Sequence, residues 1–375
     1  MTQGRSFCDQ FGVHPIVNAM GTSTIIGASP AVAEAVAAAG EALLLNFEID
    51  DLQRAASRWI AQATRTEAAC VTSSASSGIA ISAAACMTGS DLAAIARLPE
   101  TAGLRNEVIL QFAHDINFGG RVSQMVRLSG ARITHIGTAN HCDSFHLRGA
   151  LSEKTAAMLY VVNSAVNRSA DLLPLERCVD HCGSVPVIVD AAAEPDVRPF
   201  YERGASLVIT SGQKAMGAPT SGLICGKKNL VRACYLQNWG IGRAMKVGKE
   251  GIAGVIAAAE RWYHRDPHEH DRRYAAIVSQ LKLTLQVRET IWPHKVAIDL
   301  NADARKTANL LREGQPAIWV NDAVGQTITL DLRAVRIEDA PVIARAIANA
   351  QGEPREDVPF HDLYYSEERL LRWPD

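Results

Sequence analysis

The sequence lacks the features that mark secreted, membrane-spanning and nucleic-acid-binding proteins. Its first residues, MTQGRSFCDQ, contain no apolar signal core, and no stretch approaches about 18 uninterrupted apolar residues. No long basic run occurs, and the net charge is −2, from 38 basic and 40 acidic residues. A protein whose main partner is nucleic acid needs a more basic surface. We therefore expect neither a membrane nor a nucleic acid as partner.

The cysteines do not indicate a disulfide framework or a metal site. There are 8 of them, without the close spacing of a disulfide framework, so a reduced, cytoplasmic setting is the simplest interpretation. Cys178, His181 and Cys182 stand at helical spacing, but a fourth metal ligand is not evident, and buried thiols are the commoner explanation. The histidine-rich stretch 264–270 reads as a solvated helix face or loop. We expect no metal site.

What is present is an alternation of helical stretches with short apolar runs. At 375 residues the chain is long enough for two or three domains. Six runs are interpreted as strands, and most are continuously apolar, as expected when helices cover both faces of a sheet. The alternation predicts a mostly parallel α/β sheet. The runs are 67–73, 107–114, 131–137, 156–162, 185–191 and 205–211.

The pattern changes after residue 250. A long helical segment over 250–286 is followed by strands with more alternation at 294–300, 317–322 and 327–333, and by a closing helix over 339–351. This predicts a small α+β domain. We therefore expect an N-terminal segment at 1–30, a large domain at 31–250 and a small C-terminal domain at 251–375.

The stretch VTSSASSGIA, residues 71–80, is the first of three features placed at the carboxyl ends of predicted strands, where α/β sheets bind ligands. A strand ends, small hydroxyl and methyl residues follow, and an alanine-rich helix begins. Free backbone N–H groups at such a helix start suit a phosphate. A serine-rich helix cap without any ligand is the plainer alternative.

Asp190 and Lys214 are the other two features. Asp190 ends the run VPVIVDA, and a carboxylate at the end of a buried strand is costly without a partner. It is either a cap or ion-pair residue, or an anion held against a cationic ring nitrogen. Lys214 stands among small residues after ASLVITS, where poor solvation would lower its pKa and expose a nucleophilic amine. Taken alone, a plain surface lysine is the commoner explanation.

Together, the order of serine-rich loop, strand-end Asp and strand-end Lys is the chain order of pyridoxal 5'-phosphate (PLP) enzymes of the aspartate-aminotransferase type, fold type I. The sequence further resembles the family of D-glucosaminate-6-phosphate ammonia-lyase, itself similar to the SelA-type L-seryl-tRNA(Sec) selenium transferase. The resemblance runs nearly end to end and is weakest over 115–170 and after 265. The stretches that carry it are residues 11–29, 51–89, 97–114, 205–230 and 236–262.

The resemblance implies roles for individual residues. Lys214 would form a Schiff base with the cofactor, Asp190 would pair with its pyridine nitrogen, and His114 would lie over the ring face, unless it is only a hydrogen-bonded strand-end histidine. The cofactor phosphate would be held by Ser74, Ala75, Ser76 and Ser77, with Ser211 adding a hydroxyl.

Substrate contacts are implied in the same way. Thr22 and Ser23 fall in the N-terminal segment that folds back toward the site in this family. Arg243 and Lys246 are the candidates for an anionic substrate group, with a solvated helix start as the alternative. Glu194 stands where the family usually has Gln, which adds negative charge near the cofactor and suggests a different substrate.

The implied activity is PLP-dependent α,β-elimination and deamination, of the ammonia-lyase type, on an amino acid or amino-sugar acid, with Lys214 as the base at Cα. A PLP-dependent aldolase or an aminotransferase is the main rival. A selenium transferase on seryl-tRNA would need a basic surface and an extra N-terminal domain. A non-enzymatic α/β binding protein would have no reason to place Asp190 and Lys214 together at strand ends. At least a homodimer is implied, since this fold completes its sites with residues of a neighbouring subunit.

Overall fold

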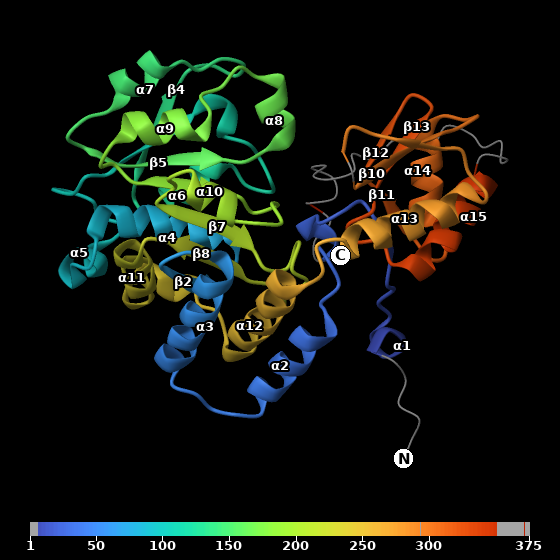
Figure 1. The fold of residues 1–375 in the computed structure, drawn as a ribbon, viewed down its shortest axis with the longest axis horizontal. Helices are drawn as coiled ribbons and strands as arrows, with labels where there is room; N and C mark the ends of the chain where they lie inside the picture. The colour runs from blue at the N-terminus through green and yellow to red at the C-terminus, as the bar shows by residue number, and fades with distance from the viewer. Residues whose placement is uncertain (1–6, 293, 351–370, 372–375) are drawn as a thin grey trace. The chain divides into compact units, whose positions relative to one another are not determined.

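The chain forms two compact units, shown with their helices and strands in Figure 1. The computed structural model describes residues 7–292, 294–350 and 371. The large unit contains residues 31–264, and the small unit combines residues up to 30 with those from 265 onward. The chain therefore passes into the small unit after His264, whereas the sequence pattern placed this boundary at residue 250.

A seven-stranded sheet is the centre of the large unit, in the strand order β2-β8-β7-β6-β5-β3-β4. Neighbours from β7 to β4 pair in parallel, whereas β8 is antiparallel to both β2 and β7. The predicted mostly parallel sheet is confirmed, and each of the six predicted runs contains one strand. The strands are β2 (Ala68–Thr72), β3 (Glu107–Gln111), β4 (Arg132–Ile136), β5 (Thr155–Val161), β6 (Val187–Asp190), β7 (Leu207–Ser211) and β8 (Gly222–Gly226).

Helices cover both faces of this sheet, which explains why its strands are continuously apolar. One core cluster joins α2, α3, α7, α9 and α12 to one face, and another joins α4, α6 and α11 to the other. The helices of the large unit are α2 (Ala33–Leu43), α3 (Ile49–Thr64), α4 (Ala75–Thr88), α5 (Leu92–Arg97), α6 (Val122–Arg127), α7 (Ser144–Ala150), α8 (Ser164–Ser169), α9 (Leu175–Cys182), α10 (Arg198–Glu202), α11 (Lys228–Leu236) and α12 (Lys249–His264), with the short 3-10 helices η2 (Phe112–His114), η3 (Gln237–Trp239) and η4 (Ile241–Met245).

The small unit contains a four-stranded antiparallel sheet in the order β12-β13-β10-β9, and a parallel pair of β1 and β11. Its apolar core packs α13, α14 and α15 against these strands, as predicted for a small α+β domain. The elements are α1 (Phe7–Phe11), β1 (Val17–Ala19), η1 (Thr24–Ile26), α13 (Glu269–Lys282), β9 (Val287–Glu289), β10 (Lys295–Asp299), α14 (Ala304–Glu313), β11 (Ile318–Val320), β12 (Asp322–Val324), β13 (Thr327–Asp331), η5 (Ile337–Asp339) and α15 (Ala340–Ala350).

The prediction of one long helix over 250–286 is wrong, because this segment forms two helices. α12 ends at His264 and α13 begins at Glu269, one in each unit. Pro267 explains the break, since a residue before proline is disfavoured in helical backbone. The Asp266 carboxylate then accepts a hydrogen bond from the His268 N–H at 2.9 Å and closes the turn.

Within the part of the chain that the structure describes, no helix combines the length and apolar character needed to cross a bilayer.

Candidate active site

The predicted cofactor residues meet at one edge of the large sheet. Asp190 ends β6, Ser211 ends β7 and Lys214 follows it, while His114 follows β3. Because β2 is antiparallel to β8, which is antiparallel to β7, β2 also runs in the direction of β7 and delivers Ser74 to the same edge. Carboxyl ends of parallel strands are where α/β sheets place their ligand sites.

Asp190 is a buried carboxylate, with 7% of its surface exposed. Burial raises its pKa from 3.8 to about 6, while the Ala192 N–H and the charge of Lys214 act in the opposite direction. Oδ1 accepts the hydrogen bond from Ala192 at 3.2 Å. Since burial penalises the ionised form, this carboxylate is suited to pair with a cationic group of a ligand.

The turn that carries Lys214 is tightly packed, which explains its small neighbours. The Gly212 N–H donates to the Ser221 carbonyl at 3.0 Å, and the Ala218 N–H donates to the Gly212 carbonyl at 2.9 Å. A Cβ at Gly212 would lie 2.4 Å from Ser221 Oγ, closer than any real contact. Ser211 is buried, and Lys214 is partly buried. The chain therefore holds the lysine backbone against β8 rather than in a free surface loop.

The serine-rich loop forms the start of α4, as predicted. Ser74 Oγ accepts from the Ser77 N–H at 3.1 Å, and Ser77 Oγ accepts from the Ser74 N–H at 3.0 Å, so the two residues form a capping box. The backbone N–H groups of Ala75 and Ser76 have no acceptor within the helix at this end. A Cβ at Gly222 would lie 2.2 Å from the Ser74 carbonyl oxygen, so only glycine lets β8 support this turn.

His114 is fully buried, at 0% exposure, in η2. Its Nδ1 accepts a hydrogen bond from the Val161 N–H at 3.3 Å, and its ring meets the Tyr160 ring edge-on, with centroids 4.7 Å apart. Burial lowers the pKa of His114 to about 4, so the imidazole is neutral at pH 7. Nε2 is buried and has no hydrogen-bond partner among the described residues. Such an atom is unusual in a folded protein. The side chain of Asn167 interacts with His114 and acts to raise its pKa, against the larger effect of burial.

Glu194 lies in the loop after β6, which is held in place by β7 and α12. Its N–H donates to the Ala191 carbonyl at 3.0 Å, and its carbonyl accepts from Thr210 Oγ1 at 3.5 Å. Trp262 Nε1 of α12 donates to the Pro195 carbonyl at 2.7 Å. The backbone around Glu194 is therefore fixed between β7 and α12.

Arg243 and Lys246 line a cavity of about 710 Å³ beside α3 and α11. Asp50, Tyr235 and Trp239 line it with them, and none of the predicted cofactor residues does. Both basic side chains are exposed. A cavity of this size with two cations can hold an anionic small molecule.

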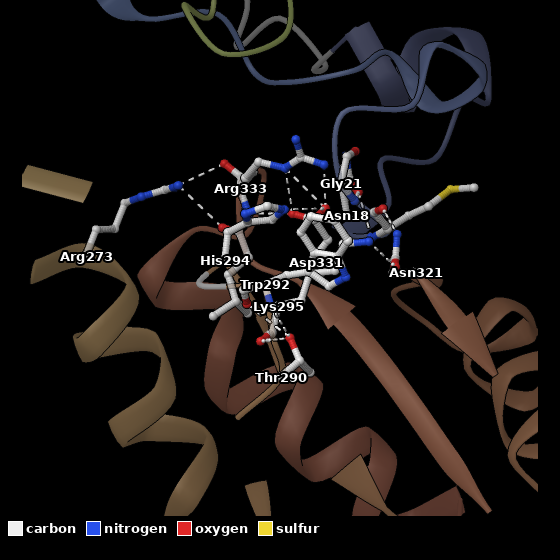
Figure 2. A network of polar contacts seen from close by, with 12 residues as sticks. Asn18, Gly21, Arg273, Thr290, Trp292, His294, Lys295, Asn321, Asp331 and Arg333 are labelled. Atoms are coloured by element: carbon white, nitrogen blue, oxygen red, sulfur yellow. Dashed lines mark hydrogen bonds and ion pairs between the residues drawn. The ribbon is translucent and has the colours of Figure 1, made fainter. Parts of the chain in front are cut away.

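Thr22 and Ser23 belong to the small unit, in a turn held by the polar network of Figure 2. Asn18 Oδ1 accepts from the N–H groups of Met20 and Gly21, at 3.0 and 3.1 Å, and its Nδ2 donates to the Gly21 and Ala28 carbonyls. Gly21 has a φ of +97°, and a Cβ there would lie 2.6 Å from Asp331 Oδ2. The turn that leads into Thr22 is therefore fixed on both sides.

Asp331 anchors this network. It is fully buried, and Arg333 donates to both of its carboxylate oxygens, with NH2 at 2.6 Å from Oδ2 and Nε at 3.0 Å from Oδ1. Figure 2 shows the pair next to Gly21. The sequence analysis did not single out Asp331 or Arg333; the only signal was a charged pair, DLR, inside an otherwise alternating strand.

Tyr160 and Asn167 are two further residues that the sequence analysis missed. Asn167 Nδ2 donates to the Tyr160 hydroxyl at 3.3 Å, beside His114. Tyr160 was part of a predicted apolar strand, and Asn167 follows it in a polar stretch without a recognisable motif. Their proximity to His114 depends on the pairing of β5 with β3, which the sequence does not specify.

Solved structures place this architecture among PLP-dependent enzymes of fold type I. SPT with PLP matches with a TM-score of 0.56 at 17% identity, over 89% of this chain and 86% of that one. D-glucosaminate-6-phosphate ammonia-lyase matches with a TM-score of 0.85 at 32% identity, over 94% of this chain and 100% of the other. The first likeness concerns the fold alone.

Sequence comparisons narrow the class to a family. A family model described as SelA, L-seryl-tRNA selenium transferase, matches residues 188–309. The D-glucosaminate-6-phosphate ammonia lyase of Salmonella typhimurium is 39% identical over 256 residues, 68% of this chain and 69% of that protein. The 5'-C-glycyluridine monooxygenase-decarboxylase of a Streptomyces species is 35% identical over 364 residues, 90% of each chain. The chain belongs to the SelA-like family of fold type I PLP-dependent enzymes, and the predicted family and cofactor are confirmed, as is the predicted class of PLP-dependent lyase.

The residues present fit PLP. The cofactor has an aldehyde for a lysine, a ring nitrogen that is cationic when protonated, and a phosphate. The sheet edge supplies Lys214, a buried carboxylate that needs a cationic partner, and a helix start with free N–H groups. The unpartnered Nε2 of His114 lies at the same edge.

Proposed function

We propose that this enzyme catalyses the α,β-elimination and deamination of an amino acid or amino-sugar acid. The net reaction converts a 3-hydroxy-2-amino acid into a 2-keto acid and ammonia, because the water lost in elimination is regained when the amine is released. One observation supports this most: Lys214 follows β7, and the buried carboxylate of Asp190 ends the neighbouring strand β6. The charge of Lys214 acts on the pKa of Asp190, and the chain belongs to a family of PLP-dependent enzymes. PLP, when bound, supplies an electron sink for the negative charge that develops at Cα.

The residues of the chain would divide the work by position. Asp190 would pair with the ring nitrogen of the cofactor through its negative charge, and the Ala75 and Ser76 N–H groups would hold the phosphate. Lys214 Nζ would hold the aldehyde of the cofactor and would serve as the general base for the proton at the substrate Cα. His114 would exclude water from this part of the site.

Substrate recognition would use the remaining predicted residues. Arg243 and Lys246 would bind an anionic group of the substrate, and the substrate contacts of Thr22 and Ser23 remain a proposal from the family resemblance. Glu194 changes the charge beside the cofactor relative to the Gln usual in this family. Support for the anionic group comes from the cavity that both basic side chains line.

A second reaction has one specific observation in its favour. The relative named 5'-C-glycyluridine monooxygenase-decarboxylase covers 90% of this chain, more than the ammonia lyase does. An oxygen-dependent decarboxylation of a glycyl-type substrate is therefore the alternative to elimination on the same cofactor.

Product analysis separates these reactions. The purified holoenzyme is incubated with a panel of amino acids and amino-sugar acids, D-glucosaminate 6-phosphate included. Keto acid with an equal amount of ammonia supports elimination, whereas consumption of oxygen with release of CO₂ supports the alternative. An aldehyde product would indicate an aldolase, and accumulated pyridoxamine phosphate an aminotransferase; either result would overturn the proposal.

We also propose that the enzyme is a cytoplasmic homodimer or higher homo-oligomer. All eight cysteines are free, which suits a reducing compartment. The segment between α2 and α3 exposes a run of apolar side chains, among them Leu44 at 87%. Large exposed apolar patches mark interaction sites. Sedimentation of the holoenzyme tests the assembly, and a monomer at micromolar concentration would contradict it.

A further inference from the structure

Trp239 is a large side chain that lies open on the wall of a cavity. It has 60% of its surface exposed, and it lines the cavity of about 710 Å³ that Arg243 and Lys246 also line. Single exposed apolar residues are common on protein surfaces, so exposure alone assigns no role to this indole. Its fixed position among groups of defined charge does.

The turn that carries Trp239 and Arg243 is held by backbone contacts. The Gly240 N–H donates to the Gln237 carbonyl at 2.8 Å, and the Arg243 N–H donates to the Gly240 carbonyl at 3.0 Å. A Cβ at Gly240 would lie 2.8 Å from a carbonyl oxygen of α5, and a Cβ at Gly242 would lie 2.8 Å from the Gln237 backbone. Both positions therefore require glycine, and the indole and the guanidinium start from one fixed piece of backbone.

The indole itself is oriented by contacts that lead to α3. The rings of Trp239 and Tyr235 meet edge-on, with centroids 5.7 Å apart and an angle of 73° between their planes. The Tyr235 hydroxyl donates in turn to Asp50 Oδ1 of α3. Because the two rings do not stack, Tyr235 leaves at least one face of the indole open for a further ring.

The charges around the cavity determine where an anion would bind. Arg243 and Lys246 are exposed, and neither has an ion-pair partner among the described residues. Asp50 is the one acidic residue among those that line the cavity. An anion is attracted by the two cations and repelled by Asp50, so it would bind at the basic turn and not beside α3.

Only a ligand with two properties uses all of these groups. A small inorganic anion would pair with the cations but leave the indole exposed. An uncharged apolar molecule would cover the indole but leave the cations unpaired. A cationic ligand could lie over the indole, but it would meet two positive charges. An aromatic ring joined to an anionic group matches the indole and the cations together.

We propose that Trp239 stacks on an aromatic ring of the substrate, whose anionic group is bound by Arg243 and Lys246. The inference rests on the proposed function, which assigns these two cations to the substrate. It narrows the substrate to an amino acid that carries an aromatic ring, in preference to an amino-sugar acid, which has none. Trp239 is then a residue that determines substrate specificity.

The test measures binding and not turnover. Phenyl phosphate, cyclohexyl phosphate and methyl phosphate carry the same anionic group and differ only in what is attached to it. Each is titrated into the holoenzyme, in which PLP fills the cofactor phosphate site, and its dissociation constant is measured by calorimetry. Ratios of dissociation constants within one protein report the contribution of the ring, because a general loss of affinity cancels.

Four variants complete the design. Trp239→Leu keeps an apolar side chain but removes the aromatic face, and Trp239→Ala removes both; should one fail to fold, the other decides. Trp59→Leu is the matched control, because this tryptophan of α3 is 51% exposed and lines neither of the two neighbouring cavities. Arg243→Ala should weaken all three ligands about tenfold and leave their ratios unchanged.

We expect phenyl phosphate to bind about tenfold more tightly than methyl phosphate and about threefold more tightly than cyclohexyl phosphate. The preference over cyclohexyl phosphate falls to near one in Trp239→Leu, and the preference over methyl phosphate falls to near one in Trp239→Ala. Both are unchanged in Trp59→Leu.

Three results would overturn the proposal: equal binding of phenyl and cyclohexyl phosphate to the unaltered protein, a ring preference that survives the changes at Trp239, or binding that Arg243→Ala does not weaken. A ring preference that depends on Trp239, in an enzyme that eliminates none of the amino acids tested, would support the proposal and count against the proposed reaction alone.

Discussion

Asp190 is the last residue of β6 and Lys214 follows the neighbouring parallel strand β7. The positive charge of Lys214 lowers the pKa of Asp190 against the larger effect of burial. A carboxylate in this position is an unfavourable element in the protein alone. It becomes favourable when a second cation, such as a protonated ring nitrogen, is placed beside it. Stability and cofactor binding are therefore coupled through Asp190.

The first prediction concerns this coupling. The pKa of Asp190 is raised from 3.8 to about 6 by burial, so the folded, cofactor-free protein binds more protons than the unfolded chain between these values. Its stability therefore falls as the pH rises from about 4 to about 6. At pH 7.5 Asp190→Asn should stabilise the cofactor-free protein, by up to about 3 kcal/mol. Urea unfolding at several pH values measures this.

The same variant has the opposite effect on the holoenzyme. Asp190→Asn should weaken PLP binding and lower kcat by about 10²-fold or more, because the ring nitrogen loses its anionic partner. A pH-independent stability difference between wild type and Asp190→Asn would contradict the assigned burial. Unchanged turnover would contradict the assigned role.

The contact of Gly222 with the Ser74 carbonyl gives a second prediction. Gly222→Ala would place a Cβ 2.2 Å from the Ser74 carbonyl oxygen, so β8 or the serine-rich turn must move. We expect a destabilisation of about 1–3 kcal/mol and weaker PLP binding. Gly40→Ala is the control, since a Cβ at this exposed helical position meets nothing within 4 Å and should be neutral or stabilising. Equal losses of stability in Gly222→Ala and Gly40→Ala would contradict the importance of the contact between Gly222 and the Ser74 carbonyl.

Substrate binding gives a third prediction. Arg243→Ala and Lys246→Ala should each raise KM for an anionic substrate about tenfold to a hundredfold, with little change in kcat, because they bind a part of the molecule away from Cα. Arg232→Ala, which lines the smaller neighbouring cavity, serves as the control. If KM responds to Arg232 and not to the other two, the anion site is misplaced.

The small unit gives a fourth prediction. Gly21 and Gly325 both have positive φ, +97° and +60°, but only Gly21 faces a buried group, Asp331. Gly325→Ala should therefore cost about 1 kcal/mol from backbone strain, and Gly21→Ala clearly more, because its methyl group also displaces the Asp331 carboxylate. Thermal unfolding compares the two. Similar losses in both variants would mean that the Asp331 contact is unimportant.

Much of the sheet could be predicted from the sequence, because buried parallel strands leave a strong local signal. The runs ending in Asp190 and Ser211 are continuously apolar and stop at a polar residue, so both their position and their edge of the sheet follow. β8 left no such signal. β8 begins and ends with a glycine. Gly222 must be glycine because of its close contact with Ser74, which only the folded chain reveals.

The parts of the site that could not be predicted depend on pairs distant in sequence. Asn167 gains its place beside His114 through strand pairing, and Asp331 meets Gly21 through the packing of the small unit. The helix predicted over 250–286 is wrong for a local reason, since Pro267 interrupts the helical pattern on either side of it. Ser29 and Pro30 would suit the cap and first turn of a helix, but α2 begins at Ala33, with Val32 as its N-cap.

The most direct measurement is borohydride reduction of the purified holoenzyme followed by peptide mass analysis. We predict that the cofactor mass is found on the peptide containing Lys214, and that Lys214→Ala abolishes both the label and the visible absorption while Lys227→Ala, an exposed lysine at the end of β8, leaves them unchanged. Cofactor attached to a different lysine, or visible absorption and turnover that persist in Lys214→Ala, would contradict the account.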